Sequence, residues 1–486
     1  MKRIILSLLV TALILAGCSG NGTSSSAVTS EFFKGKIEGE ITVSAYDHMM
    51  LSSFLEEAAK IFELMYPGTK VNVVTYTAMP VITTGEADGY EFTSMQSSDT
   101  PQDRADYISR VNVDIMSGRG ADIYVMDILP IHKFVKSGVL ENLDHYMNTD
   151  PGFNKNDYRL NIIEAVRYQN GIWFLPLDYQ FDYYAYDSAL IPAEIARNFG
   201  INRAYTAEEL IGMTGHLYNG VNKIFNQMVY TTRGSGLYNI VLNENYRSFV
   251  NLDTGRPYFL DGRFVSMLDS LKNYGEQGFV PQSITSQNSA EQALQWMTYF
   301  EDLSNRVFIK QYSDMHLLFA LSKDGGIGSM ATMSSGIEED DEIAGIVANA
   351  DGTVPFRFTR AFAVNSQSKN KLTAWTFIKF LMSKEMQLSI FTLPVHNEAR
   401  EEKSELSFTG AIYGIENPMT ERMRIAYNNY RNIIETLSDM INTFVVQDSN
   451  LNEMISQEVQ YFFDGSRTAE EVARALQNKA DLYLSE

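Results

Sequence analysis

The stretch that decides the fold reads EITVSAYDHMMLSSFLEEAAKIFELMYPGTKVNVVTY and covers residues 40–76. Residues 40–46 alternate in polarity and carry β-branched side chains, which predicts a strand. The alternating valines and threonine of residues 71–75 predict a second strand. Between the two, the apolar residues recur at helical spacing, so the stretch predicts a strand, a helix and a second strand.

The helix of this stretch has recognisable start and stop signals. Its apolar face runs from Leu51 to Met65. Ser53 and Glu56 have the spacing of a capping box, and Pro67-Gly68 cannot continue a helix. We therefore expect one amphipathic helix that ends just before the second strand.

The pattern repeats further along the chain. Residues 77–100 are rich in Thr, Ser, Gly and acidic residues, and their weak periodicity indicates a long surface loop or excursion to which the sequence assigns no regular structure. Thr100-Pro101 starts another helix that closes at Gly118, and residues 121–126 predict a buried strand. Strands that alternate with helices indicate βαβ units, a parallel sheet and an α/β fold.

Two strand ends carry candidate ligand-binding residues. Tyr46 and Asp47 end the first strand, and Met126 and Asp127 end the strand at 121–126. Ligands of open α/β sheets bind at the carboxyl ends of the strands, which favours a binding role for these four residues. A turn and a helix cap would explain either pair equally well.

Composition excludes several function classes. The chain has 486 residues, of which 45% are hydrophobic and 20% charged, as in ordinary globular proteins of two or three domains. The 39 Lys and Arg residues face 60 Asp and Glu residues, so the formal charge of −21 disfavours nucleic acid. One cysteine cannot form an intrachain disulfide, and the six histidines lack the spacing of a metal site. No motif indicates a cofactor, a metal or a catalytic residue.

The N-terminus has the features of an export signal. Lys2 and Arg3 precede an apolar stretch, Ile4 to Ala16, that is too short to span a bilayer comfortably. The small residues before Cys18 resemble a bacterial lipoprotein signal, which implies cleavage before Cys18 and acylation of its thiol. An ordinary signal peptide with a chance cysteine is the alternative. We expect residues 18–36 to form a flexible tether to the membrane.

Several segments resemble the extracellular solute-binding proteins of ABC importers, specifically the carbohydrate-binding group that includes the maltose-binding proteins. Each segment is a weak pattern, but their order and spacing are specific together. The matching segments are residues 54–71, 117–123, 137–144, 171–187, 361–365, 374–387 and 463–472.

The resemblance implies a two-lobe periplasmic-binding-protein-like fold of type II, with an interleaved chain and a hinge. One lobe would comprise residues 37–180 and 356–415, and the other residues 181–355 and 416–486. The implied function is a lipid-anchored extracytoplasmic receptor, a monomer and not an enzyme, that binds a solute between the lobes and delivers it to ABC permease subunits. The solute implied is a sugar or an oligosaccharide.

Further ligand-binding candidates lie where the chain crosses between the lobes. Asp178, Tyr179, Gln180 and Tyr183 combine aromatic rings with carboxylate and amide groups, which suits sugar hydroxyls and sugar faces. Half-buried strand tyrosines are the competing explanation. The resemblance adds Tyr238 and Met333 as candidates. The guanidinium of Arg360, just before the returning strand, suits hydroxyls or a carboxylate. Helix initiation, core packing and a surface ion pair would explain these three residues as well.

Two other function classes stay open. A surface glycan-processing enzyme would bind similar ligands, and a sensor or peptide-binding module could use the same fold.

Overall fold

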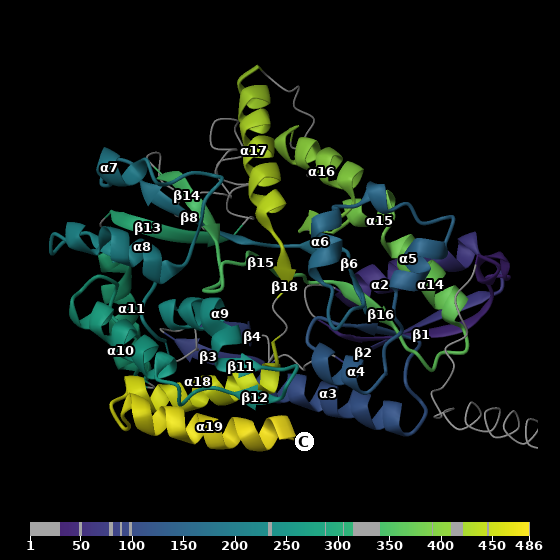
Figure 1. The fold of residues 1–486 in the computed structure, drawn as a ribbon, viewed down its shortest axis with the longest axis horizontal. Helices are drawn as coiled ribbons and strands as arrows, with labels where there is room; N and C mark the ends of the chain where they lie inside the picture. Colours follow the sequence, from purple (N-terminus) through teal and green to yellow (C-terminus); the bar gives the residue numbers. More distant parts are fainter. Residues whose placement is uncertain are drawn as a thin grey trace, which may run out of the picture.

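The computed structural model describes residues 30–47, 51–76, 81–87, 90–96, 100–231, 236–286, 288–304, 306–313, 341–390, 392–409, 421–444 and 447–485. Two lobes lie side by side, and each is built around its own five-stranded sheet (Figure 1). The architecture is the two-lobe α/β fold that the sequence predicts.

The first lobe has the strand order β2-β1-β5-β16-β6. Strand β1 runs parallel to both β2 and β5, as the βαβ pattern predicts, whereas β16 returns antiparallel to β5 and β6. These strands are β1 (Gly39–Tyr46), β2 (Thr69–Tyr76), β5 (Ile123–Val125), β6 (Leu175–Pro176) and β16 (Ala361–Val364).

Helices cover this sheet and bury large side chains such as Phe62 and Trp375 against it. The Trp375 indole N–H donates to the Asp150 carboxylate at 2.7 Å, so its polar atom is satisfied inside the core. The helices are α2 (Leu51–Met65), α3 (Pro101–Met116), α4 (Ile131–Lys136), α5 (Asp144–Thr149), α6 (Leu160–Ala165), α14 (Lys371–Leu381), α15 (Lys384–Leu388) and α16 (Asn397–Thr409); short 3-10 turns lie at Phe32–Lys34 and Lys155–Asp157.

The start of α2 differs in detail from the prediction. The helix already begins at Leu51, so Ser53 and Glu56 lie inside it. Asp47 accepts hydrogen bonds from the Ser52 backbone N–H at 2.9 Å and from the Ser52 hydroxyl at 2.8 Å. A carboxylate that receives an otherwise unpaired N–H of the first turn has the function of a helix cap.

Residues 77–100 contain a hairpin where the sequence predicted a loop. Strand β3 (Val81–Ala87) pairs antiparallel with β4 (Tyr90–Gln96) in continuous register. The sequence did not indicate these two strands because acidic residues and glycine weaken the alternation, although Thr, Tyr and Phe favour strands. The predicted helix that follows is confirmed: Thr100 caps α3, Pro101 is its first residue, and it ends just before Gly118.

The second lobe has the strand order β10-β13-β8-β14-β9. Four of these strands share one direction, and β8 runs antiparallel between β13 and β14. The strands are β8 (Asp182–Asp187), β9 (Ala204–Tyr205), β10 (Lys223–Phe225), β13 (Val307–Ser313) and β14 (Asp341–Val347), with a small pair β11 (Val250–Asn251) and β12 (Arg256–Pro257).

Its helices form a second core around residues such as Leu237, Phe264 and Val459. They are α7 (Ala193–Ala196), α8 (Ala207–Thr214), α9 (Leu237–Phe249), α10 (Arg263–Glu276), α11 (Ser289–Ser304), α18 (Ser449–Phe463) and α19 (Ala469–Ser485), with a 3-10 turn at Gly215–Leu217.

The chain crosses between the lobes through short paired segments. Strand β7 (Asp178–Tyr179) leads into β8 and pairs with β17 (Leu393–Pro394). Strand β15 (Pro355–Phe356), on the return path, runs parallel to β18 (Thr443–Phe444), which joins α17 (Glu421–Met440) to α18. These crossings form the hinge region.

Helix α17 stands between the lobes in Figure 1. Its Ile434 and Leu437 belong to the first core, whereas α18 and α19 pack in the second. The range 416–486, expected in the second lobe, therefore contains helices that join both cores.

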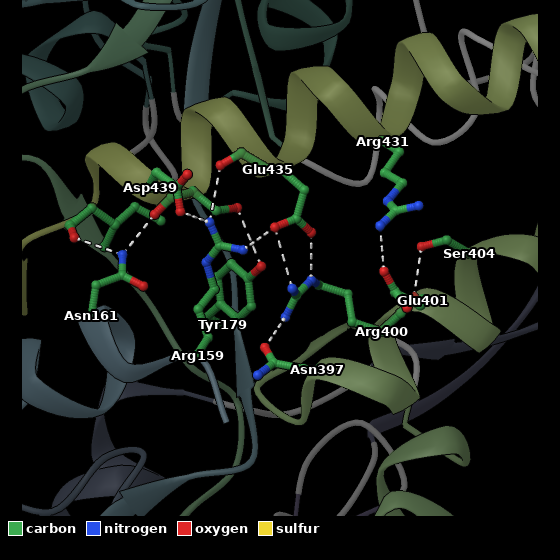
Figure 2. Close-up of polar contacts among 12 residues, drawn as sticks. Arg159, Asn161, Tyr179, Asn397, Arg400, Glu401, Ser404, Arg431, Glu435 and Asp439 are labelled. Atoms are coloured by element: carbon green, nitrogen blue, oxygen red, sulfur yellow. Dashed lines mark hydrogen bonds and ion pairs between the residues drawn. The ribbon is translucent and has the colours of Figure 1, made fainter. Parts of the chain in front are cut away.

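A polar cluster fastens α17 to the first lobe (Figure 2). Arg159, only 6% exposed, donates to the Glu435 carboxylate at 2.5 Å and to Asp439 at 2.5 Å. Arg400 donates to the same Glu435 carboxylate at 2.9 Å. Burial raises the pKa of Glu435, but the charges of Arg400 and Arg159 outweigh this effect and leave the pKa below its usual value.

We predict that Glu435→Ala lowers the free energy of unfolding by about 1–2 kcal/mol, because it leaves the buried Arg159 without its main acceptor. The folded-state pKa of Glu435 is depressed. Its contribution to the free energy of unfolding is therefore fully present at pH values above the ordinary pKa of 4.5, and it is lost as the pH falls through the lower folded-state pKa. Urea unfolding at pH 7 and at pH 4 measures both effects.

The matched control is Glu421→Ala, which removes an exposed pair with Arg424 on the same helix. Its expected cost is at most about 0.5 kcal/mol. Equal losses for the two variants would contradict the role of Glu435.

Candidate functional site

A cavity of about 1080 Å³ lies between the two lobes. The start of α3 and the segment after β5 line it from the first lobe, and α9, α18 and several strand ends line it from the second. Residues of β15 and β18 also line it, so the cavity lies at the hinge. A ligand held there touches both lobes at once.

Strand ends supply part of the lining. Met126 and Asp127 follow β5 in the first lobe. In the second lobe, Gln227 follows β10, Gln311 belongs to β13 and Asn349 follows β14. Strands β10, β13 and β14 run in one direction, so their carboxyl ends meet at one edge of the sheet, where α/β folds bind ligands.

Phenylalanines form the apolar part of the lining. Phe356, Phe358 and Phe444 border the cavity. The Phe444 ring centroid lies 4.9 Å from that of Phe358, 5.9 Å from that of Phe356 and 5.7 Å from that of Phe174. Rings at these distances make stabilising aromatic contacts, and they present an apolar surface next to the polar residues of the cavity.

Amide side chains dominate the polar lining of the second lobe. The Gln447 side chain donates to Asn243 Oδ1 at 3.1 Å and accepts from the side-chain amide of Asn452 at 3.1 Å, which links α9 to α18. An amide carries both donors and acceptors and no charge, as a sugar hydroxyl does. Other lining amides of the described chain are Gln102, Gln227, Asn239, Gln311, Asn349, Asn450 and Gln457.

Two ionisable groups of the lining have partners within the protein. Arg357 forms a two-pronged ion pair with Asp182, at 2.5 and 2.8 Å. Glu244 is 4% exposed and accepts from the Tyr184 hydroxyl at 2.5 Å and from the Ala207 N–H at 3.0 Å. Burial raises the pKa of Glu244 well above its ordinary value, although these hydrogen bonds oppose the shift.

The lobes also touch directly beside the cavity. His132 Nε2 on α4 lies 3.5 Å from Asp448 Oδ2 at the start of α18. Lys133 lies over the Tyr483 ring of α19, 4.1 Å from its centroid. Burial lowers the pKa of His132, and the Asp448 carboxylate opposes this shift. These contacts join the two lobes in the arrangement that forms the cavity.

Of the residues proposed from the sequence, Met126 and Asp127 line this cavity. Tyr46 is 1% exposed, and its ring stacks on Tyr76 at 5.9 Å. Asp47 caps α2. The ligand-binding role of all four residues stays a prediction.

Asp178 and Arg360 contact each other. Both are buried, and Arg360 Nη1 lies 3.1 Å from Asp178 Oδ2. The same carboxylate accepts from the Thr359 N–H at 2.7 Å and from the Thr392 hydroxyl at 2.6 Å. This geometry is that of a buried structural ion pair at the crossing between the lobes.

The other candidates lie in the core or at the hinge. Tyr179 is buried and contacts Ser438 of α17 at 3.2 Å, while Gln180 exchanges two backbone hydrogen bonds with Arg357. Tyr183 and Tyr238 are buried among other rings. Cys18 and Met333 lie outside the described residues.

The profile of the bacterial extracellular solute-binding proteins matches residues 98–403, well over half of the chain. The chain belongs to this family. Membership places this solute-binding protein outside the cytoplasm. No curated protein sequence matches the chain.

Solved structures share the two-lobe fold at low sequence identity. One is a family 1 extracellular solute-binding protein from Alicyclobacillus acidocaldarius subsp. acidocaldarius DSM 446, with a TM-score of 0.52, 13% identity and coverage of 93% of this chain and 100% of that one. An ABC substrate-binding protein from Listeria monocytogenes, in complex with cycloalternan, has a TM-score of 0.52, 16% identity and coverage of 92% and 99%. The sugar-binding protein MalE from Xanthomonas citri has a TM-score of 0.52, 12% identity and coverage of 92% and 98%.

In the part of the chain that the structure describes, no helix is both long and apolar enough to cross a bilayer. Nor do three or more His, Cys, Asp or Glu residues gather there in a way that could hold a metal ion.

Sequence reasoning missed most of the lining of this solute-binding protein. The largest omission is the start of α18, where Asp448 caps the helix and Ser449, Asn450 and Asn452 follow. An N-cap followed by a polar run was the available signal, but the same signal marks many helices that face only solvent.

We predict that Asp178→Ala lowers the free energy of unfolding of the unliganded protein by about 3–5 kcal/mol, because Arg360 would remain buried without its carboxylate. The matched control is Asp182→Ala, whose partner Arg357 is 55% exposed and whose loss should cost under about 1 kcal/mol. Urea unfolding gives both values. Unchanged stability of Asp178→Ala together with lost ligand binding would instead assign Asp178 to the ligand.

Proposed function

We propose that the protein is a lipid-anchored receptor that captures a sugar or an oligosaccharide between its lobes and delivers it to an ABC transporter permease. The observation that carries this proposal is the cavity at the hinge, with phenylalanine surface on one part and amides on another. Sugars present apolar ring faces and hydroxyl rims, so this combination matches their chemistry.

The size of the cavity favours a ligand of more than one ring. Its volume is about 1080 Å³. Sites for drug-sized ligands typically enclose about 300–1,000 Å³, so this cavity is slightly larger than that range. The Listeria monocytogenes protein of the same fold is described in complex with cycloalternan, and the Xanthomonas citri protein as sugar-binding.

A hinge allows the protein to indicate that a ligand is bound without altering the ligand chemically. A ligand that contacts both lobes favours the arrangement in which they meet, and a permease can distinguish this arrangement from the open one. The bound solute leaves unaltered in this proposal, so the protein is a receptor and not an enzyme.

The sequence around Cys18 supports the proposed lipid anchor. A basic head, an apolar core and Leu15-Ala16-Gly17 precede the only cysteine of the chain. Acylation by more than one chain gives stable attachment to a membrane. Labelling of the full chain with a radioactive fatty acid should depend on this thiol, and undiminished labelling of Cys18→Ser would contradict the anchor.

We predict that the mature protein shows a rise in melting temperature with one or more saccharides from a panel of neutral and charged oligosaccharides. Mass spectrometry should recover the bound saccharide unchanged. A shift with peptides and none with saccharides would overturn the proposal, and hydrolysis of the bound saccharide would favour an enzyme.

We also predict that Asn239→Ala and Gln311→Ala each weaken saccharide binding about 3- to 10-fold, the usual contribution of one neutral hydrogen bond. Isothermal titration calorimetry measures the loss. The matched control is Asn198→Ala, an exposed amide of the same lobe that does not line the cavity. Loss of the same size in the control would show that the cavity is not the binding site.

A further inference from the structure

The charged side chains of the cavity are unevenly distributed between the two signs. Within the described lining, the carboxyl groups outnumber the guanidinium groups. The carboxyl groups belong to Asp127, Asp182, Glu244 and Glu453, and the guanidinium groups to Arg104 and Arg357.

Among the lining carboxyl groups of the second lobe, compensation within the protein singles out Glu453. The Asp182 carboxylate is paired with Arg357, and the buried Glu244 accepts hydrogen bonds from the Tyr184 hydroxyl and the Ala207 N–H. The Glu453 carboxylate, on the second turn of α18, accepts from the neutral Gln457 amide at 2.9 Å and has no cationic partner among the described residues.

The other α18 residues that line the cavity beside Glu453 are uncharged. Asn450, Asn452, Ser456 and Gln457 lie beside it on α18 and also line the cavity. Amides and hydroxyls can satisfy the hydroxyl groups of a ligand, but they cannot neutralise a carboxylate. An anionic group placed against this wall would therefore be repelled by Glu453, and the repulsion is strengthened where the ligand excludes water.

We propose that the cavity selects uncharged oligosaccharides over their anionic counterparts and that Glu453 is a specificity-determining residue for this choice. The inference rests on the proposed capture of a sugar and specifies which class of sugar is captured. Discrimination by a repulsive group is a common way to reject a competitor that resembles the correct ligand.

The first experiment compares two panels of tetrasaccharides by isothermal titration calorimetry on the mature protein. The neutral panel contains maltotetraose, cellotetraose, mannotetraose and xylotetraose, and the anionic panel contains tetragalacturonate, tetramannuronate and a hyaluronan tetrasaccharide. We expect the tightest ligand to be neutral, with every anionic probe weaker by about tenfold or more. Tightest binding of an anionic probe would overturn the inference but leave sugar capture intact, whereas binding of no saccharide would refute sugar capture itself.

The second experiment assigns the discrimination to Glu453. The best neutral ligand is compared with its derivative in which C6 hydroxyls are oxidised to carboxylates. The wild-type protein should bind the oxidised form more weakly than the neutral form, by a factor of about ten or more. This gap in affinity between the two forms should be smaller in Glu453→Gln and at high salt. The control Glu194→Gln, an exposed carboxylate of the same lobe outside the lining, should leave the gap unchanged. An unchanged gap in Glu453→Gln would overturn the role of this residue.

Discussion

The pairing of short strands where the chain crosses between the lobes is the constraint on which the rest of the structure depends. Gln180 and Arg357 exchange two backbone hydrogen bonds, of 2.7 and 2.8 Å, and β15 pairs with β18 beside them. These contacts satisfy the backbone of the crossing segments without merging the two sheets. Each lobe therefore keeps its own core, and bending can concentrate at the few residues between them. The cavity lies at this point because Phe356 and Phe444 belong to the same paired strands.

The crossing between the lobes also explains why several residues proposed to bind the ligand are buried. A segment that enters the protein interior must satisfy its polar groups, and Asp178 does so with Thr359, Arg360 and Thr392. Carboxylates and aromatic rings suit both a sugar and a buried crossing. Successive strand residues point to opposite faces, so a shift of one position decides whether a side chain faces the ligand or the protein core. Sequence spacing alone does not fix the position of the strand here.

The sequence predicts the regular parts of the fold and little of the site. The β1–α2–β2 unit and the α3–β5 unit carry clear periodicity and turn signals, and both are confirmed. The hinge strands are only two residues long, so no periodicity can reveal them. Met126 and Asp127 were found because strand ends bind ligands as a rule. The amides of α18 were missed because their exposure to a cavity depends on the second lobe facing the first, which is a tertiary property.

The composition of the lining also bears on how binding and closure are coupled. A single neutral hydrogen bond contributes about 0.5–1.5 kcal/mol, so useful affinity requires many of them at once. Most of the amides lie on the second lobe, whereas Arg104 and Asp127 lie on the first and the phenylalanines lie at the hinge. A ligand that touches the amides of the second lobe alone gains the same energy in the open and the closed arrangement and cannot favour closure. Only a ligand long enough to reach first-lobe residues such as Gln102, Arg104 or Asp127 as well has a differential interaction with the closed state. The size of the solute is therefore tied to the signal that a permease would read.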